Sequence, residues 1–266
     1  MKYCLSSRCS KTYLEQADEI KVEWRDRAEI PDLPIKYPSL DILLQFTPSQ
    51  IQDNIPWEEL ETYNTICQGK FILVCDTPER CREAKERGFR FYYGFPINSF
   101  ALLHTLKDMG AEYARLGPAL FFDMPAAAKV GLPIRVIPNI AYDDGWNYKD
   151  GVCGTWIRPE DMDVYEPYVA AVEFEDCAPT KETALYRVYA LGHGWKTDIA
   201  DLVTNIGMSA YNPMLSKDMS RRRLTCKQRR SSSVSSMCEA CRVRFKLADY
   251  EKLENYKEKL MEGKED

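Results

Sequence analysis

Eight short β-rich runs recur along the first two thirds of the chain, about twenty residues apart, and most are preceded by a helix-like stretch. The runs are KVEW (21–24), ILLQF (42–46), FILVC (71–75), RFYYG (90–94), EYARLG (112–117), IRVIPN (134–139), GTWIR (154–158) and AAVEF (170–174). Strands that alternate with helices favour parallel pairing through βαβ units, and eight such units favour closure into a barrel. The pattern therefore predicts an α/β fold of the (β/α)8 TIM-barrel type, small and made irregular by some short crossovers.

Three of the intervening stretches are the clearest helices: WEELETYNTI, PERCREAKERG and NSFALLHTLKDMG. Gly88 and Gly110 stand where a helix C-terminus favours a positive φ. We expect the barrel to span residues 1–178, a helical extension 179–214, and a basic cysteine-bearing tail with a C-terminal helix 215–266.

The alternation of side chains along each strand predicts what fills the barrel. Apolar side chains should face the helices, which sends a polar set toward the barrel axis. That inward set comprises Lys21, Glu23, Arg25, Gln45, Asp76, Arg115, Arg135, Asn139, Trp156, Arg158, Glu173 and Glu175. Barrel interiors are usually filled with Val, Ile and Leu, so such a lining needs a specific explanation.

Two interpretations of the charged lining stay open. Buried charges are costly unless they are paired, so the side chains can form internal salt bridges. They can also form a site for a polar, anionic ligand at the C-terminal mouth, where barrel enzymes hold their chemistry. In that case Arg25, Arg115 and Arg158 would clamp a carboxylate or phosphate, and Glu173 or Glu175 would serve as a base. The remaining members of the predicted substrate site are Asp76 and Asn139.

The ten cysteines divide into two groups. Cys67, Cys75 and Cys81 lie in apolar contexts and are expected to be small core residues. Cys226, Cys238 and Cys241 form a C-x11-C-x2-C pattern typical of thiolate metal sites. A fourth ligand is needed: Cys177 follows the last predicted strand, and the alternatives are Cys153, Cys4 and Cys9. The metal would be zinc or a four-cysteine iron–sulfur cluster.

Charge is unevenly distributed. Between Ser216 and Lys246 there are ten Lys or Arg against two acids, whereas the whole chain carries a net charge of −5. This basic stretch predicts contact with phosphates of a nucleic acid, or with a protein partner. The expected contacts are Arg221, Arg222, Arg223, Arg229 and Arg230. No apolar run reaches the ~18 residues of a membrane span, and no signal-like stretch opens the chain, so we expect a cytoplasmic protein without a membrane partner.

The chain resembles the collagenase-like peptidase family (family U-thirty-two). The resemblance rests on the eight strand signals and on ADEIKVEWRDR, GAEYARLG, GTWIRPEDMDVYEPYVAAVEFED and MCEACR. It implies a barrel followed by a cysteine-containing segment. Several members of the family take part in oxygen-independent hydroxylation of RNA bases or quinone precursors, and some bind a [4Fe–4S] cluster through four cysteines. The positions that carry this over are Cys226, Cys238 and Cys241, with Cys177. The pair here is C-x2-C, one residue shorter than the usual family spacing, and no glycine-rich segment precedes it.

Three functions follow in order of preference. The first is a metal-dependent modification of RNA or a small aromatic substrate. The second is a non-catalytic barrel that binds nucleic acid or protein and holds a structural zinc. A peptidase comes last, because the chain has no HExxH or GxSxG motif and only two histidines, His104 and His193.

Overall fold

The computed structural model describes residues 1–46, 55–121, 123–139, 141–142, 153–154, 157, 162–175 and 178–191. Within them eight parallel strands close into a barrel in the order β1-β10-β7-β6-β5-β4-β3-β2. The predicted α/β barrel is therefore confirmed. The barrel strands are β1 (Lys2–Ser6), β2 (Glu19–Glu23), β3 (Asp41–Gln45), β4 (Phe71–Cys75), β5 (Arg90–Ile97), β6 (Ala114–Leu116), β7 (Ile134–Val136) and β10 (Val169–Glu173).

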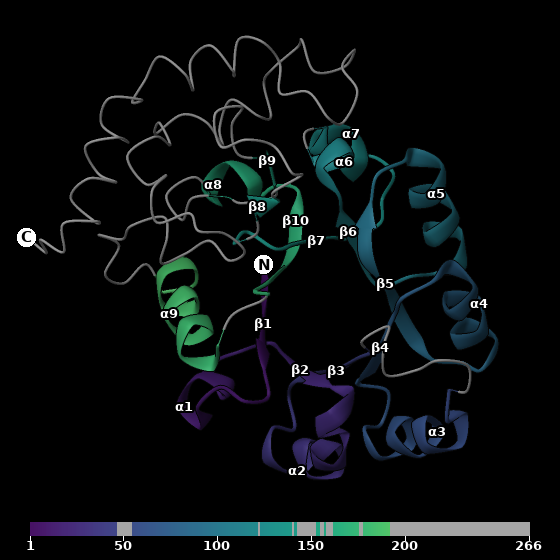
Figure 1. The fold of residues 1–266 in the computed structure, drawn as a ribbon, viewed down its shortest axis with the longest axis vertical. Coiled ribbons are helices and arrows are strands. Elements are labelled where there is room, and N and C mark those ends of the chain that lie inside the picture. The colour runs from purple at the N-terminus through teal and green to yellow at the C-terminus, as the bar shows by residue number, and fades with distance from the viewer. Residues whose placement is uncertain are drawn as a thin grey trace, which may run out of the picture.

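Helices stand outside the ring of strands (Figure 1). They are α1 (Lys11–Leu14), the 3-10 helix η1 (Trp24–Asp32), α2 (Leu33–Lys36), α3 (Trp57–Ile66), α4 (Pro78–Glu86), α5 (Phe100–Met109), α6 (Pro118–Phe121), α7 (Met124–Ala128), α8 (Met162–Tyr165) and α9 (Pro179–Tyr189). The three helices that the sequence marks most clearly are α3, α4 and α5. Gly88 and Gly110 follow α4 and α5 with φ of 77° and 85°, as the capping pattern predicts.

One predicted barrel strand is wrong and one was missed. Gly154 pairs with Ala141 in a separate antiparallel hairpin of β8 (Ala141–Tyr142) and β9 (Cys153–Gly154), so GTWIR is not a barrel strand. The eighth position belongs to β1, which pairs with both β10 and β2 and closes the ring. Short β-prone runs look alike whether they end in a hairpin or in a barrel, because periodicity reports the strand and not its partner.

The apolar core has two parts. The larger part lies between the strands and the helices and includes Val22, Leu44, Leu73 and Phe91. A smaller cluster lies inside the ring, where side chains from β3, β4 and β5 meet those of β1 and β10. It contains Cys4, Leu43, Ile72, Val74, Tyr92, Tyr113 and Ala171. The interior is therefore mixed: the β3–β4 side is apolar, and the charged side chains come mainly from β2, β6, β7 and β10.

The segment that follows the barrel begins with α9, which packs on β1. The Tyr3 hydroxyl donates to the carbonyl of Tyr189 at 2.9 Å, which holds the end of α9 to the first strand. The other parts of the predicted extension, 192–214, and the predicted tail, 215–266, lie outside the described residues. The boundaries proposed for them remain predictions.

Candidate functional site at the C-terminal mouth of the barrel

Arg135 occupies the centre of the barrel. Its side chain, projected inward from β7, is fully buried and forms ion pairs with Glu19 of β2 and, at 3.3 Å, with Glu173 of β10. The rings of Tyr92 and Tyr113 lie 5.0 and 4.3 Å from its guanidinium carbon, close enough for cation–π attraction. These contacts compensate the burial of a charge that would otherwise be very costly.

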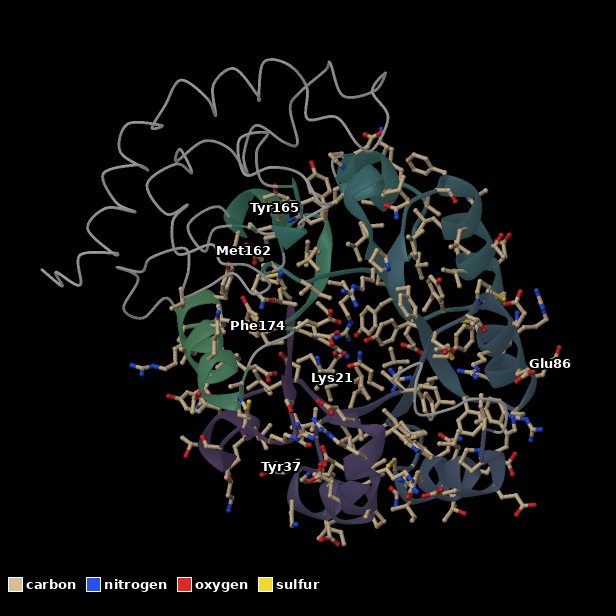
Figure 2. All side chains as sticks on the ribbon, in the orientation of Figure 1. Lys21, Tyr37, Glu86, Met162, Tyr165 and Phe174 are labelled. Carbon is tan, nitrogen blue, oxygen red and sulfur yellow. The ribbon has the colours of Figure 1, made fainter. Side chains whose placement is uncertain are left out.

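Lys21 lies nearer the mouth and shares Glu173 with Arg135. Its Nζ is 2.7 Å from Glu173 Oε1 and 3.2 Å from the carbonyl oxygen of Phe174, and Figure 2 shows Lys21 directed into the ring of strands. Burial alone would disfavour the lysine charge, but Glu173 and the neighbouring carboxylates outweigh it and raise the pKa of Lys21. The amine is therefore held as an ammonium, which makes it a structural cation and not a nucleophile.

Glu173 is the acceptor at the junction of this network. Besides Lys21 and Arg135 it accepts a hydrogen bond from the Tyr92 hydroxyl at 3.2 Å. Burial acts to raise the pKa of Glu173, yet the two cations prevail and lower it to about 2. Glu173 is thus a fixed carboxylate, and the base suggested by its position in the sequence is not supported by these surroundings.

Arg115 and Glu175 form a second ion pair at the mouth. Arg115 Nη1 and Nη2 lie 2.6 and 2.7 Å from the two carboxylate oxygens of Glu175, in bidentate geometry. Asn139 fixes the glutamate backbone from both sides, donating to its carbonyl at 2.8 Å and accepting from its N–H at 3.3 Å. Burial is the largest influence on Glu175 and raises its pKa above the ordinary value, although Arg115 opposes the shift. This side chain is the one predicted base in the site whose surroundings favour a proton.

Gly94 shapes the mouth beside Arg115. Pairing between β5 and β6 is irregular between Tyr93 and Ile97, and the Gly94 carbonyl accepts from Arg115 Nη1 at 2.8 Å. A Cβ at Gly94 would lie only 2.6 Å from Val74 Cγ1, so a larger residue would force the Val74 side chain or the backbone of β5 to shift. Glycine at this position therefore lets the backbone of β5 approach both the Val74 side chain of β4 and the Arg115 guanidinium.

Two of the remaining predicted substrate-site residues, Arg25 and Asp76, pair with other side chains. Arg25 is in η1, its side chain is 56% exposed, and it pairs with Glu23 at 2.7 Å, so the structure does not bring it to Arg115. Asp76 pairs with Arg80 of α4 at 2.6 Å. Arg158 lies outside the described residues.

The prediction missed three polar side chains inside the barrel: Glu19, Tyr92 and Tyr113. The Tyr113 hydroxyl donates to Glu19 at 2.6 Å. The signal was present for Glu19, because it has the same strand parity as Lys21, but the expected strand began two residues too late. Strand alternation does not single out Tyr92 and Tyr113, because tyrosine rings suit either face of a barrel strand.

At the opposite end of the barrel a further group of ion pairs joins the strands, and Lys2 links it to Glu19 of the central network at 3.7 Å. Asp41 joins Lys2 at 3.0 Å and Arg90 at 2.8 Å, and Arg90 also pairs with Glu112 at 3.0 Å. These partly exposed pairs lie at the amino ends of the strands. In barrel enzymes that end contributes to stability, whereas the carboxyl ends carry the chemistry.

The predicted metal ligands Cys177, Cys226, Cys238 and Cys241 lie outside the described residues, as do Arg221, Arg222, Arg223, Arg229 and Arg230. Within the part of the chain that the structure describes, no group of three or more His, Cys, Asp or Glu side chains could hold a metal ion. Cys67, Cys75 and Cys81 are buried, as expected for core residues.

The two alternative ligands near the N-terminus differ. Cys4 is buried inside the barrel, and burial raises the pKa of its thiol well above the ordinary value. Cys9 follows the carboxyl end of β1, and its Sγ lies 3.7 Å from the carbonyl oxygen of Pro179, two residues after Cys177 in the sequence. Of these two thiols, only Cys9 lies against the start of α9.

Comparison with known proteins identifies no family. No family model matches the chain, and no curated protein matches it. A solved structure of a conserved protein of unknown function from Enterococcus faecalis is similar, with 15% sequence identity and a TM-score of 0.44. The alignment covers 72% of this chain and 66% of that protein. Among the described residues no helix is long and apolar enough to cross a membrane.

Proposed function

We propose that this chain is a metal-binding barrel protein of the U-thirty-two peptidase-like type that modifies a polar substrate at its C-terminal mouth. The substrate class implied by the resemblance is RNA or a small aromatic molecule. The observation that carries the proposal is the convergence of Lys21, Arg115, Asn139 and Glu175 at the carboxyl ends of four strands, the end at which barrel enzymes hold their chemistry.

The residues at the mouth have separable roles in this proposal. Arg115 and Asn139 would orient the substrate, because both are fixed by bonds to the backbone, at Gly94 and Glu175. Glu175 would hold or release a proton, since burial raises its pKa. Lys21 and Glu173 would keep the floor of the site rigid through their 2.7 Å ion pair.

The metal in this proposal is an iron–sulfur cluster held by Cys226, Cys238 and Cys241 with Cys177 as fourth ligand. The proposal puts the cluster at this end of the barrel, because Glu175 stands two residues before Cys177 in the sequence and Cys9 contacts Pro179, two residues after it. Cys9 is the alternative fourth ligand. When bound, such a cluster supplies one-electron transfer. A cytoplasmic setting suits reduced thiols, and Arg221, Arg222, Arg223, Arg229 and Arg230 would hold the phosphates of an RNA substrate.

The metal is tested on the full chain purified without oxygen. We expect visible absorption of an iron–sulfur cluster and iron in elemental analysis, both lost in Cys226→Ala and Cys238→Ala. Cys67→Ala is the matched control, since this thiol is buried in the core beside α3. A colourless protein that holds one zinc contradicts the redox function, and unchanged metal in both ligand variants removes the site altogether.

A second candidate is a barrel without chemistry that binds nucleic acid or protein and holds a structural zinc. It is favoured by the pairing of the interior charges with one another, since Lys21, Arg115 and Arg135 each contact a carboxylate. Gel retardation of RNA at several salt concentrations separates the two candidates when combined with metal analysis. Binding that does not weaken with salt would argue against contact through phosphates.

A peptidase ranks last. His104 is exposed on α5, away from the mouth, and gives no support to a nucleophile–histidine pair there. Absence of cleavage of casein or denatured collagen by the purified protein would dispose of this function.

A further inference from the structure

The pair of Arg115 and Glu175 has the geometry of a guanidinium bound to a ligand carboxylate. Both carboxylate oxygens meet different guanidinium nitrogens, at 2.6 and 2.7 Å. This two-bond arrangement is the one by which arginine selects carboxylates in binding sites. The carboxylate that occupies the position here comes from the protein itself.

The two partners are fixed to different degrees. Arg115 projects from within β6 and is also bonded to the Gly94 carbonyl at 2.8 Å, so its guanidinium stays in place without the glutamate. Glu175 lies beyond the end of β10, and Asn139 bonds to its backbone and not to its carboxylate. The main chain of Glu175 is thus held by bonds that do not involve its carboxylate. The side chains are 13% and 15% exposed, so both reach the surface of the mouth.

The deeper ion pairs do not include Arg115 or Glu175. Lys21 and Arg135 share Glu173, and Arg135 also pairs with Glu19. Exchanging the Glu175 carboxylate for a ligand carboxylate would keep one negative charge on Arg115 and leave that network intact. Arg115 would keep a carboxylate partner throughout, so the exchange would avoid the free-energy cost of an unpaired buried charge.

We propose that Arg115 is the receptor for a carboxylate group of the ligand and that Glu175 is its internal competitor. A ligand binds by displacing the Glu175 carboxylate, so the pair holds the site closed until a competing carboxylate arrives. This inference rests on the proposed function in that it concerns the same mouth, and it names the group by which the substrate is recognised. Because the internal carboxylate is present at all times, the apparent affinity equals the intrinsic affinity multiplied by the fraction of time that Arg115 is free to bind.

The test measures binding of benzoate to the full chain by calorimetry, with benzyl alcohol as the uncharged analogue. Glu175→Gln removes the competing charge and should tighten benzoate binding by about tenfold or more, if the pair is closed at least nine tenths of the time. Glu23→Gln is the matched control. It removes the same charge at the same end of the barrel, but Glu23 pairs with Arg8 and Arg25. The gain should vanish when Arg115→Lys is added to Glu175→Gln, and benzyl alcohol should bind no better to any variant.

Equal benzoate affinity in Glu175→Gln and Glu23→Gln would overturn the proposal, as would a gain that survives Arg115→Lys. If circular dichroism shows that Glu175→Gln is unfolded, Glu175→Asp serves instead. Its shorter side chain cannot keep both bonds, so a smaller gain is expected, and no gain is again a refutation. Metal content is measured on the same samples. A benzoate gain in protein without metal would support the receptor while contradicting the metal-dependent function.

Discussion

Arg135 and Arg115 project into the same barrel from neighbouring strands, but their side chains are buried to different extents. Arg135 is fully buried, lies between two tyrosine rings, and pairs with carboxylates from β2 and β10. Arg115 is the direct register partner of Arg135 across β6 and β7, yet it keeps a small exposed area and meets a carboxylate beyond the end of β10. The first is enclosed by partners from within strands, whereas the second pairs with a carboxylate at the rim and with the Gly94 carbonyl.

The difference shows what separates a structural charge from a binding charge in a barrel. Both arginines satisfy the same alternation rule, so strand parity cannot distinguish them. What distinguishes them is whether the partner carboxylate lies inside a strand, as Glu19 and Glu173 do, or in the segment that follows one, as Glu175 does. Partners within strands cannot leave without breaking the barrel. Partners beyond the strand ends can.

The comparison is tested most strongly by removing each guanidinium. Arg135→Met leaves Glu19 and Glu173 in a buried site without their shared cation, and we expect a loss of about 3–5 kcal/mol in unfolding free energy. Arg115→Met should lose less than half as much, because the Arg115–Glu175 pair is partly exposed and one carboxylate, not two, loses its cation. Urea unfolding followed by circular dichroism measures both. Equal losses would mean that the mouth pair is as deeply structural as the centre.

Acid should weaken the central network in a defined pH range. The pKa of Glu173 in the folded chain is about 2, below its ordinary 4.5. A group with a lowered folded-state pKa stabilises the fold above its unfolded-state pKa, and this contribution fades as pH falls toward the folded-state value. We expect about 2 kcal/mol of stability from this carboxylate to be lost between pH 7 and pH 3.

Glu173→Gln provides the comparison for that pH effect. The variant is less stable at neutral pH, because Lys21 and Arg135 lose a charged partner. Its unfolding free energy should nevertheless fall less steeply between pH 5 and pH 3 than that of the unmodified chain. Parallel curves for the two proteins would show that Glu173 is not the carboxylate responsible.

The tyrosine hydroxyls around Arg135 should have intermediate effects. Tyr113→Phe removes the donor to Glu19 and keeps the ring over the guanidinium, so we expect a loss of about 1–2 kcal/mol, the cost of an unmet bond to a buried charged acceptor. Tyr93→Phe is the control, since that half-buried ring packs against the outer core. Its effect should stay within about 0.5 kcal/mol. A loss for Tyr113→Phe no larger than the control would mean that Glu19 is satisfied by Arg135 alone.

Much of this architecture could be predicted because local chemistry determines it. Helices α3, α4 and α5 carry their own start and stop signals, such as the Thr77 side chain that caps α4 and Gly110 after α5. Strand parity correctly placed Lys21, Arg115, Arg135, Asn139, Glu173 and Glu175 inside the barrel. Each of these conclusions needs only the spacing of residues within one element.

What could not be predicted depends on contacts between distant elements. The closing strand β1 is indistinguishable from a hairpin strand until its pairing with β10 is known. Arg25 was assigned to the clamp because the expected strand ran past Trp24, whereas the chain turns into η1 there and carries the side chain outward. The partner of each buried charge, 60 residues away for Arg115 and Glu175, is likewise set by barrel closure and not by the sequence near it.

The smallest effect is expected at Arg25, an exposed arginine outside the pair that is compared. Its exposed pair with Glu23 should contribute little, so Arg25→Ala should change unfolding free energy by about 0.5 kcal/mol or less. The same variant should leave benzoate affinity unchanged, in the unmodified chain and in Glu175→Gln alike, since Arg25 does not reach Arg115. Calorimetry on these two backgrounds decides the matter. Weaker binding in either would mean that η1 brings a second guanidinium to the ligand. Arg25 would then take part in the ligand site at Arg115 although its own partner, Glu23, lies outside the central network.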